Sequence, residues 1–110
     1  MTPQHQELAA GRWKALSFVE QMANIGGEVE RMLNWRAKRH AAYAERAFER
    51  ALELLDLTLA ATRRRERLKE VARAREAVVD YVMGPNAAGS TDASWRRYFL
   101  PFAYAARKHR

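Results

Sequence analysis

The chain has 110 residues, no cysteine and a formal net charge of +7, and no apolar run reaches the roughly 18 to 20 residues of a membrane-spanning helix. This length suits one domain covering residues 1–110, and the lack of cysteine excludes disulfides, thiol nucleophiles and thiolate metal sites. We therefore expect a cytoplasmic protein without a membrane span, whose residues 1–12 form a loose N-terminal tail.

Apolar residues recur at helical spacing from about residue 15 to residue 38 and predict the first helix. Gly26 and Gly27 interrupt this pattern, and each costs about 1 kcal/mol relative to alanine inside a helix. They indicate either a notch for close packing or a bend. The pattern then shifts phase, which predicts a tight turn near Arg39 and His40, with a single long bent helix as the alternative.

Apolar stripes from Ala41 to Ala60 and from Arg64 to Met83 predict the second and third helices. Arg75 lies on the stripe of the third helix, and a buried guanidinium without a partner costs several kcal/mol. Asp56 on the second helix is the predicted partner in a buried ion pair, with Glu53 as the second candidate.

The segment from Gly84 to Thr91 is rich in loop-forming residues, and its glycine spacing imitates a phosphate-binding loop. The lysine of such a loop is replaced by Ser90, and no other strand pattern accompanies it, so a plain connection is expected. Ser90 or Thr91 then caps a fourth helix with Asp92 in its first turn, and Pro101 should kink that helix.

Four amphipathic helices with short connections can bury their stripes only against one another. The sequence therefore predicts an all-α fold, an antiparallel up-and-down four-helix bundle. The three histidines lie at no metal-ligand spacing, and the sequence predicts neither a cofactor nor a metal site.

The excess positive charge lies in the second half of the chain. Residues 1–60 hold eight basic and eight acidic side chains, whereas residues 61–110 hold twelve basic and five acidic ones. Arginine, which binds phosphate through paired contacts, far outnumbers lysine. In an antiparallel bundle the start of the third helix and the end of the fourth lie at the same end, with Arg12 and Lys14 as possible neighbours. The predicted binding surface for RNA or DNA backbone consists of Arg63, Arg64, Arg65, Arg67, Arg107 and Lys108.

Three stretches, "MANIGGEVERMLNW", "AFERALELLDLT" and "RYFLPFAYAARK", resemble a family of small, uncharacterised prokaryotic helical proteins with the same order of segments. That resemblance implies a helical fold and a prokaryotic origin. In size and basicity the chain is also similar, more loosely, to the accessory variability proteins of diversity-generating retroelements. That likeness implies an oligomeric bundle that binds nucleic acid and a reverse transcriptase.

The segment "REAVVDY", from Arg75 to Tyr81, resembles the active helix of HEPN ribonucleases, which are four-helix bundles with an Arg followed by a His. Asp80 occupies the place of that histidine, so the residue most needed for acid and base chemistry is missing.

The leading hypothesis is a non-enzymatic, homo-oligomeric bundle that binds nucleic-acid backbone as an accessory subunit of a larger enzyme. One alternative is an adaptor or antitoxin-like partner of an acidic protein. The other is a degenerate HEPN-like ribonuclease that uses Arg75, Asp80 and Tyr81.

Overall fold

The computed structural model describes residues 10–108, and all of the regular structure in that range is helical. A short helix over residues 10–15 precedes four long helices, and no strand occurs in this part of the chain. The long helices are α2 (Phe18–Ala37), α3 (Ala41–Ala61), α4 (Arg65–Met83) and α5 (Asp92–Lys108). The expected all-α class is therefore confirmed. No helix within residues 10–108 is long and apolar enough to cross a membrane.

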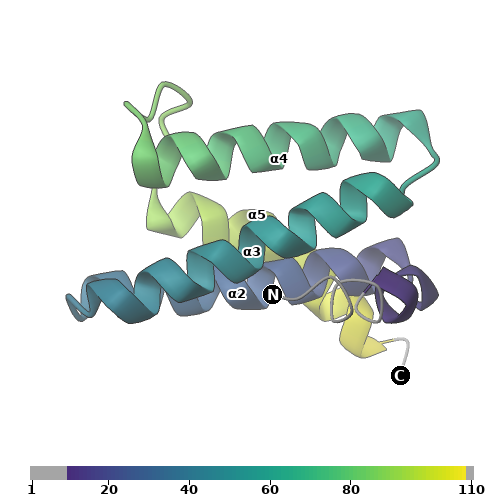
Figure 1. The fold of residues 1–110 in the computed structure, drawn as a ribbon, viewed down its shortest axis with the longest axis horizontal. Helices are drawn as coiled ribbons and strands as arrows, with labels where there is room; N and C mark the ends of the chain where they lie inside the picture. Colours follow the sequence, from purple (N-terminus) through teal and green to yellow (C-terminus); the bar gives the residue numbers. More distant parts are fainter. Residues whose placement is uncertain (1–9, 109–110) are drawn as a thin grey trace.

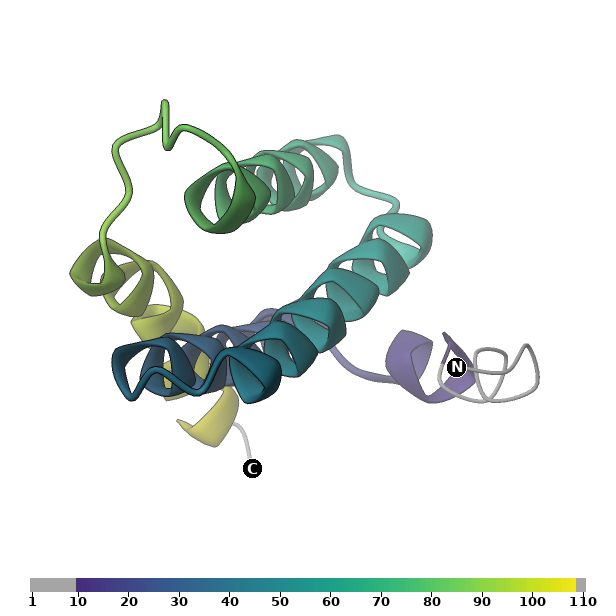
Figure 2. The same cartoon turned by 60° about the vertical axis from the view of Figure 1, so that its left-hand side comes forward.

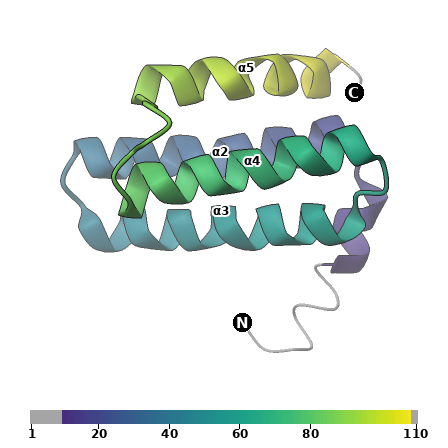
Figure 3. The ribbon, with the colours of Figure 1, turned by 90° about the horizontal axis from the view of Figure 1, so that it is seen from above.

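Successive long helices run in opposite directions, as Figure 3 shows from above. Helix α2 packs closely against both α3 and α5, whereas α4 packs more sparsely and mainly against α3 (Figures 1 and 2). Helices α4 and α5 consequently face each other across a groove instead of closing the fourth side of the molecule.

The core is centred on α2, because that helix has neighbours on two sides. Its buried residues recur at intervals of three and four, and α3, α4 and α5 supply the rest of the core. Each fully buried large apolar side chain contributes about 1.5–3 kcal/mol relative to its exposed state. The largest apolar side chains that are fully buried are Met22, Ile25, Val29, Met32, Leu33, Leu55, Val71 and Val78.

The first predicted helix, expected from about residue 15, begins at Phe18, and a separate short helix that was not predicted precedes it, with a break at Leu16 and Ser17. Ser17 caps α2: its Oγ accepts from the Glu20 amide at 3.1 Å, and the Glu20 carboxylate accepts from the Ser17 amide at 2.9 Å. The sequence pattern did not separate this capping box from the preceding helical turn. Of the predicted tail over residues 1–12, residues 1–9 lie outside the described range, and residues 10–12 are helical.

The residue 10–15 helix is fixed to the core by buried hydrogen bonds. The Trp13 indole donates to Thr58 Oγ1 at 2.8 Å, and the buried Gln21 side-chain amide donates to the Trp13 carbonyl at 2.9 Å. Thr58 Oγ1 also donates to the Leu54 carbonyl at 2.8 Å. This network joins the short helix to both α2 and α3.

The predicted turn at Arg39 and His40 is present, and Arg39 adopts a positive φ of 61° there. The connection between α4 and α5 closes on its own side chains, because Asn86 exchanges two 2.9 Å hydrogen bonds with the backbone of Ser90. Thr91 caps α5, since its Oγ1 accepts from the Ser94 amide at 3.0 Å. The amides of this connection are thus largely used within it, as expected for a plain connection.

Candidate nucleic-acid interface

A basic cleft of about 360 Å³ lies where the short N-terminal helix, the end of α3 and the start of α4 meet. Its cations are Lys14, Arg63, Arg64 and Arg67, and all four side chains are exposed. The remaining walls are polar or apolar and are formed by Leu16, Phe18, Gln21, Ala61 and Thr62. We refer to this group of residues as the basic cleft.

Lys14 reaches the basic cleft because of the buried network around Trp13. Trp13 of the short helix is held by two hydrogen bonds, one from its indole to Thr58 of α3 and one to its carbonyl from Gln21 of α2. Lys14 directly follows Trp13 and is therefore fixed in place with it. Lys14 therefore joins Arg63 and Arg64 in one site, although it lies about 50 residues earlier in the sequence. Thr62 is fixed beside them because its hydroxyl donates to the Thr58 carbonyl at 2.6 Å.

The basic cleft has no internal charge compensation. None of the described residues that line it is acidic, and no ion pair within residues 10–108 involves its four cations. The first amides of α4 have no acceptor inside the helix, and Arg64 does not cap them with its side chain. Exposed guanidinium groups beside such a helix start form an arrangement that suits a phosphate group.

Arg67 is positioned by an aromatic ring. Its Cζ lies 4.9 Å from the centroid of the Phe18 ring, a cation–π arrangement that leaves the guanidinium edge available for hydrogen bonds. Phe18 in turn packs edge-on against Phe102 of α5, with ring centroids 6.3 Å apart. The start of α4 is thus linked to α5 through α2.

The other predicted members of the binding surface lie outside the basic cleft. Arg65 is exposed on the first turn of α4 but does not line it. Arg107 and Lys108 do not line it either, although both are exposed at the end of α5. Figure 3 places that end at the same end of the molecule as the start of α4, but Figures 1 and 2 place the two on opposite sides. The expected single patch is divided because α5 packs on α2 and not beside α4.

The predicted pair of Arg75 and Asp56 forms, with Arg75 Nε 2.7 Å from Asp56 Oδ1. It is not buried as expected, since the two side chains are 36% and 57% exposed. The cause is that α4 packs only sparsely on α3, so water reaches the seam between them.

The three residues that resemble a HEPN active helix have separate partners. Arg75 binds Asp56, whereas Asp80 Oδ2 accepts from the amide of Ala88 at 3.2 Å. The Tyr81 hydroxyl donates to Asp92 Oδ1, and the guanidinium of Arg36 lies 5.1 Å from the Tyr81 ring centroid. Burial, followed by the hydrogen bond to Asp92, raises the pKa of Tyr81 above its ordinary value. Each of the three side chains therefore makes a structural contact of its own. Within residues 10–108, no group of three or more metal-ligating side chains gathers.

A second cationic and aromatic cluster at the turn between α2 and α3 was not predicted. The Trp35 and Tyr43 rings lie 4.8 Å apart, with Lys38 over the former and Arg46 over the latter. Basic and aromatic residues interleave in "WRAKRHAAYAER", and that pattern could have indicated the cluster. It lies at the opposite end of the molecule from the basic cleft (Figure 1).

Comparison with known proteins gives no relative on which to base an assignment. The chain matches no protein-family model, no curated protein and no solved structure. The candidate site therefore has to be interpreted from its own geometry and charge.

Proposed function

We propose that this protein binds the phosphate backbone of RNA or DNA through the basic cleft. The observation that carries the proposal is the convergence of Lys14, Arg63, Arg64 and Arg67 on one cleft without an acidic residue in its lining. Structural ion pairing does not account for these side chains, because they make none within the described part of the chain.

The chemistry of the basic cleft favours backbone over base recognition. Arginines at a helix start supply forked donors and a partial positive charge, both of which match phosphate oxygens. Contacts of this kind position a nucleic acid without identifying its sequence. We therefore infer sequence-independent binding that weakens steeply as the salt concentration rises.

The protein acts, in this proposal, as a non-enzymatic accessory subunit of a larger nucleic-acid enzyme in the cytoplasm, and it self-associates. We further infer an up-and-down four-helix bundle, supported by the alternating directions of α2 to α5. A bend of α5 at Pro101 is supported by the proline ring, which removes one backbone hydrogen bond inside that helix.

The proposal is tested by reversing the charge of the basic cleft. Arg63→Glu, Arg64→Glu and Arg67→Glu together should weaken binding of a labelled single-stranded RNA or DNA by about 100-fold or more, since each lost charge-assisted hydrogen bond is worth about 1.5–3 kcal/mol. Fluorescence anisotropy at several salt concentrations measures this effect. For the wild type, log K should fall with log salt at a slope of about −3 for single strands, as expected for about four phosphate contacts.

The matched control carries the same change in net charge elsewhere: Arg39→Glu, Arg97→Glu and Lys108→Glu. These side chains are exposed and do not line the basic cleft. The control should retain most of the affinity, and both variants should keep the helical circular dichroism spectrum. If both variants lost nucleic-acid affinity equally, the overall charge of the protein and not the basic cleft would account for the binding. Binding of an acidic protein but of no nucleic acid would replace this function by the adaptor alternative.

A further inference from the structure

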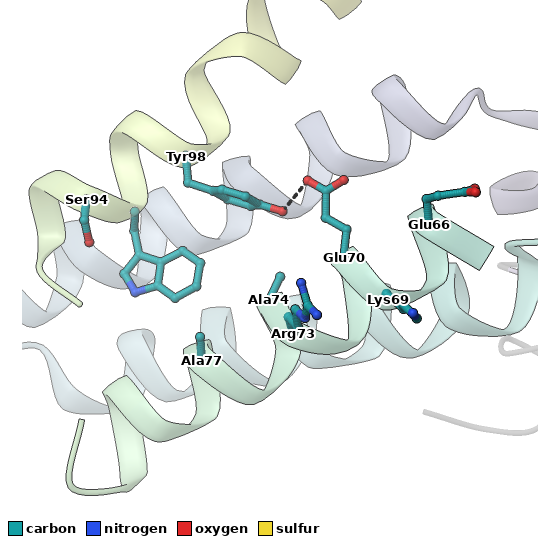
Figure 4. Close-up of a pocket in the computed structure, with 9 residues that line it drawn as sticks. Glu66, Lys69, Glu70, Arg73, Ala74, Ala77, Ser94 and Tyr98 are labelled. Atoms are coloured by element: carbon teal, nitrogen blue, oxygen red, sulfur yellow. Dashed lines mark hydrogen bonds between the residues drawn. The ribbon is translucent and has the colours of Figure 1, made fainter. Parts of the chain in front are cut away.

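A groove lies between α4 and α5, and no element of the described chain fills it. Its volume is about 650 Å³ (Figure 4). Ala74, Ala77, Trp95 and Tyr98 form an apolar lining, together with Ser94. Both α4 and α5 contribute to it, because neither helix packs closely against the other.

Charged side chains of alternating sign line the α4 side of the groove. In chain order they are Glu66, Lys69, Glu70 and Arg73, which share one helix face because they are spaced by three and four residues. Within residues 10–108, three of these side chains form no ion pair: Glu66, Lys69 and Arg73. Glu70 accepts a 2.8 Å hydrogen bond from the Tyr98 hydroxyl, which spans the groove (Figure 4). We call these four residues the α4 charge stripe.

Trp95, at one wall of the groove, holds a buried polar atom without a hydrogen-bond partner in the described part of the chain. It lines the groove and is almost fully buried, yet its indole Nε1 has no acceptor among the described residues. Buried indole N–H groups usually find a partner. The other buried indole with a described environment, that of Trp13, has such a partner in Thr58.

We propose that the groove is a self-association surface, on which α4 of a second copy lies antiparallel to α4 of the first. In an antiparallel pair centred between Lys69 and Glu70, each side chain of the α4 charge stripe faces one of opposite sign. Glu66 faces Arg73 of the second copy, and Lys69 faces Glu70 of the second copy. The order of charges along α4 is therefore complementary to itself when reversed.

A second copy fits this surface better than other partners do. A polyanion such as nucleic acid would meet Glu66 and Glu70, and an acidic protein would meet the same repulsion. A basic partner would meet Lys69 and Arg73. A two-fold symmetric contact instead uses one patch twice, and it requires only the self-complementarity that this stripe has.

The dimer has a consequence for the proposed nucleic-acid function. Each α4 begins at a basic cleft, so a pair of α4 helices would carry two such clefts on one assembly. The self-association does not depend on nucleic-acid binding, and it is tested on the protein alone.

Charge reversal at one symmetric pair of positions provides the test. Sedimentation equilibrium of the full chain should show a monomer–dimer equilibrium for the wild type. Glu66→Lys alone places like charges opposite each other, and so does Arg73→Glu alone. Each should raise the dimer dissociation constant at least about tenfold.

Two rescues distinguish pairing across the interface from a general loss of structure. The double variant Glu66→Lys with Arg73→Glu should dimerise again, because the two introduced charges meet across the dyad. An equimolar mixture of the two single variants should form a heterodimer for the same reason. Glu53→Lys, an exposed change on α3 outside the groove, is the matched control and should dimerise as the wild type does.

A wild-type chain that stays monomeric at millimolar concentration would overturn the proposal. So would a dimer that neither single variant weakens, because its interface would then lie elsewhere, for example at the exposed Leu100 and Tyr104 of α5. A monomer that loses nucleic-acid affinity in Arg73→Glu would assign the groove to nucleic acid instead.

Discussion

Gly26 on α2 lies directly against Phe99 on α5: a Cβ atom placed on Gly26 would be 2.8 Å from Cβ of Phe99. The next residue, Gly27, has open space around the equivalent position. Of the two explanations offered by the sequence, the first glycine is therefore a notch for close helix packing. The second has no packing reason in the described structure.

The two glycines should respond in opposite directions to the same substitution. Gly26→Ala should lower the free energy of unfolding by about 1–3 kcal/mol, because the added methyl group overpacks the contact with Phe99. Gly27→Ala should raise it by about 0.5–1 kcal/mol, since alanine is the better helix former and nothing obstructs it. Urea unfolding monitored by circular dichroism measures both. Equal effects in the two variants would contradict the assignment of the notch.

Removal of the Thr58 hydroxyl should destabilise the protein and loosen the short N-terminal helix. Thr58→Val keeps the shape but leaves the Trp13 indole without its acceptor, at a cost of about 1–3 kcal/mol. The indole N–H hydrogen of Trp13 should then exchange faster with solvent, which NMR measures. Thr58→Ser keeps the hydroxyl and should retain the slow exchange. Nucleic-acid affinity should also fall in the valine variant, because Lys14 would no longer be held at the basic cleft.

Stability should decline at alkaline pH partly through Tyr98. Burial, followed by the hydrogen bond to Glu70, raises the pKa of the Tyr98 phenol above its ordinary value of 10.0. In the unfolded chain the phenol ionises near pH 10, whereas in the folded chain it keeps its proton to higher pH. Its contribution is thus complete below pH 10.0 and is lost as the pH rises beyond it.

Tyr98→Phe isolates this contribution. The variant should be about 0.5–1.5 kcal/mol less stable than the wild type at pH 7, where the hydroxyl donates to Glu70. Above pH 10.0 that difference in stability should shrink, because the Tyr98 phenol then ionises in the unfolded wild type. Urea midpoints measured from pH 7 to 11 give the comparison, and a difference that is constant over this range would exclude the Tyr98 contribution.

The exposed pair of Arg75 and Asp56 should contribute little. Asp56→Asn removes the charge, but solvent screens a pair of this exposure, so the expected loss is about 0–1 kcal/mol and smaller at high salt. A loss of about 3–5 kcal/mol would instead be typical of a buried pair that has lost one partner. Thermal unfolding at low and at high salt separates these outcomes.

The four long helices could be predicted because each has a long amphipathic pattern. The predicted segments beginning at Ala41 and Arg64 agree closely with α3 and α4. The short helix over residues 10–15 was missed because it has too few residues to show an apolar period, although the spacing of Ser17 and Glu20 is that of a capping box at the start of α2. Leu68, an apolar residue of the predicted stripe from Arg64 to Met83, is 38% exposed, because α4 packs only sparsely on its neighbours.

The basic cleft was partly predictable. Arg63, Arg64 and Arg67 could be found from charge density alone, and Lys14 was a possible neighbour. Sequence alone could not separate them from Arg107 and Lys108, because the direction of a helix fixes which end of the molecule it reaches but not which side. Gln21 depends on a hydrogen bond to the short N-terminal helix, and Thr62 on a bond to the carbonyl four residues earlier; neither bond leaves a periodic signal in the sequence.

The sparse packing of α4 also bears on the order in which the native structure opens. Only Val71, Ala74 and Val78 of this helix are buried, so its detachment exposes less apolar surface than detachment of α2 would. Such an element exchanges its amide hydrogens through sub-global opening, at a smaller free energy than complete unfolding. The arginines of α4 thus lie on the segment that a bound ligand would protect most, and ligand binding would be measurable as slower amide exchange far from the ligand itself.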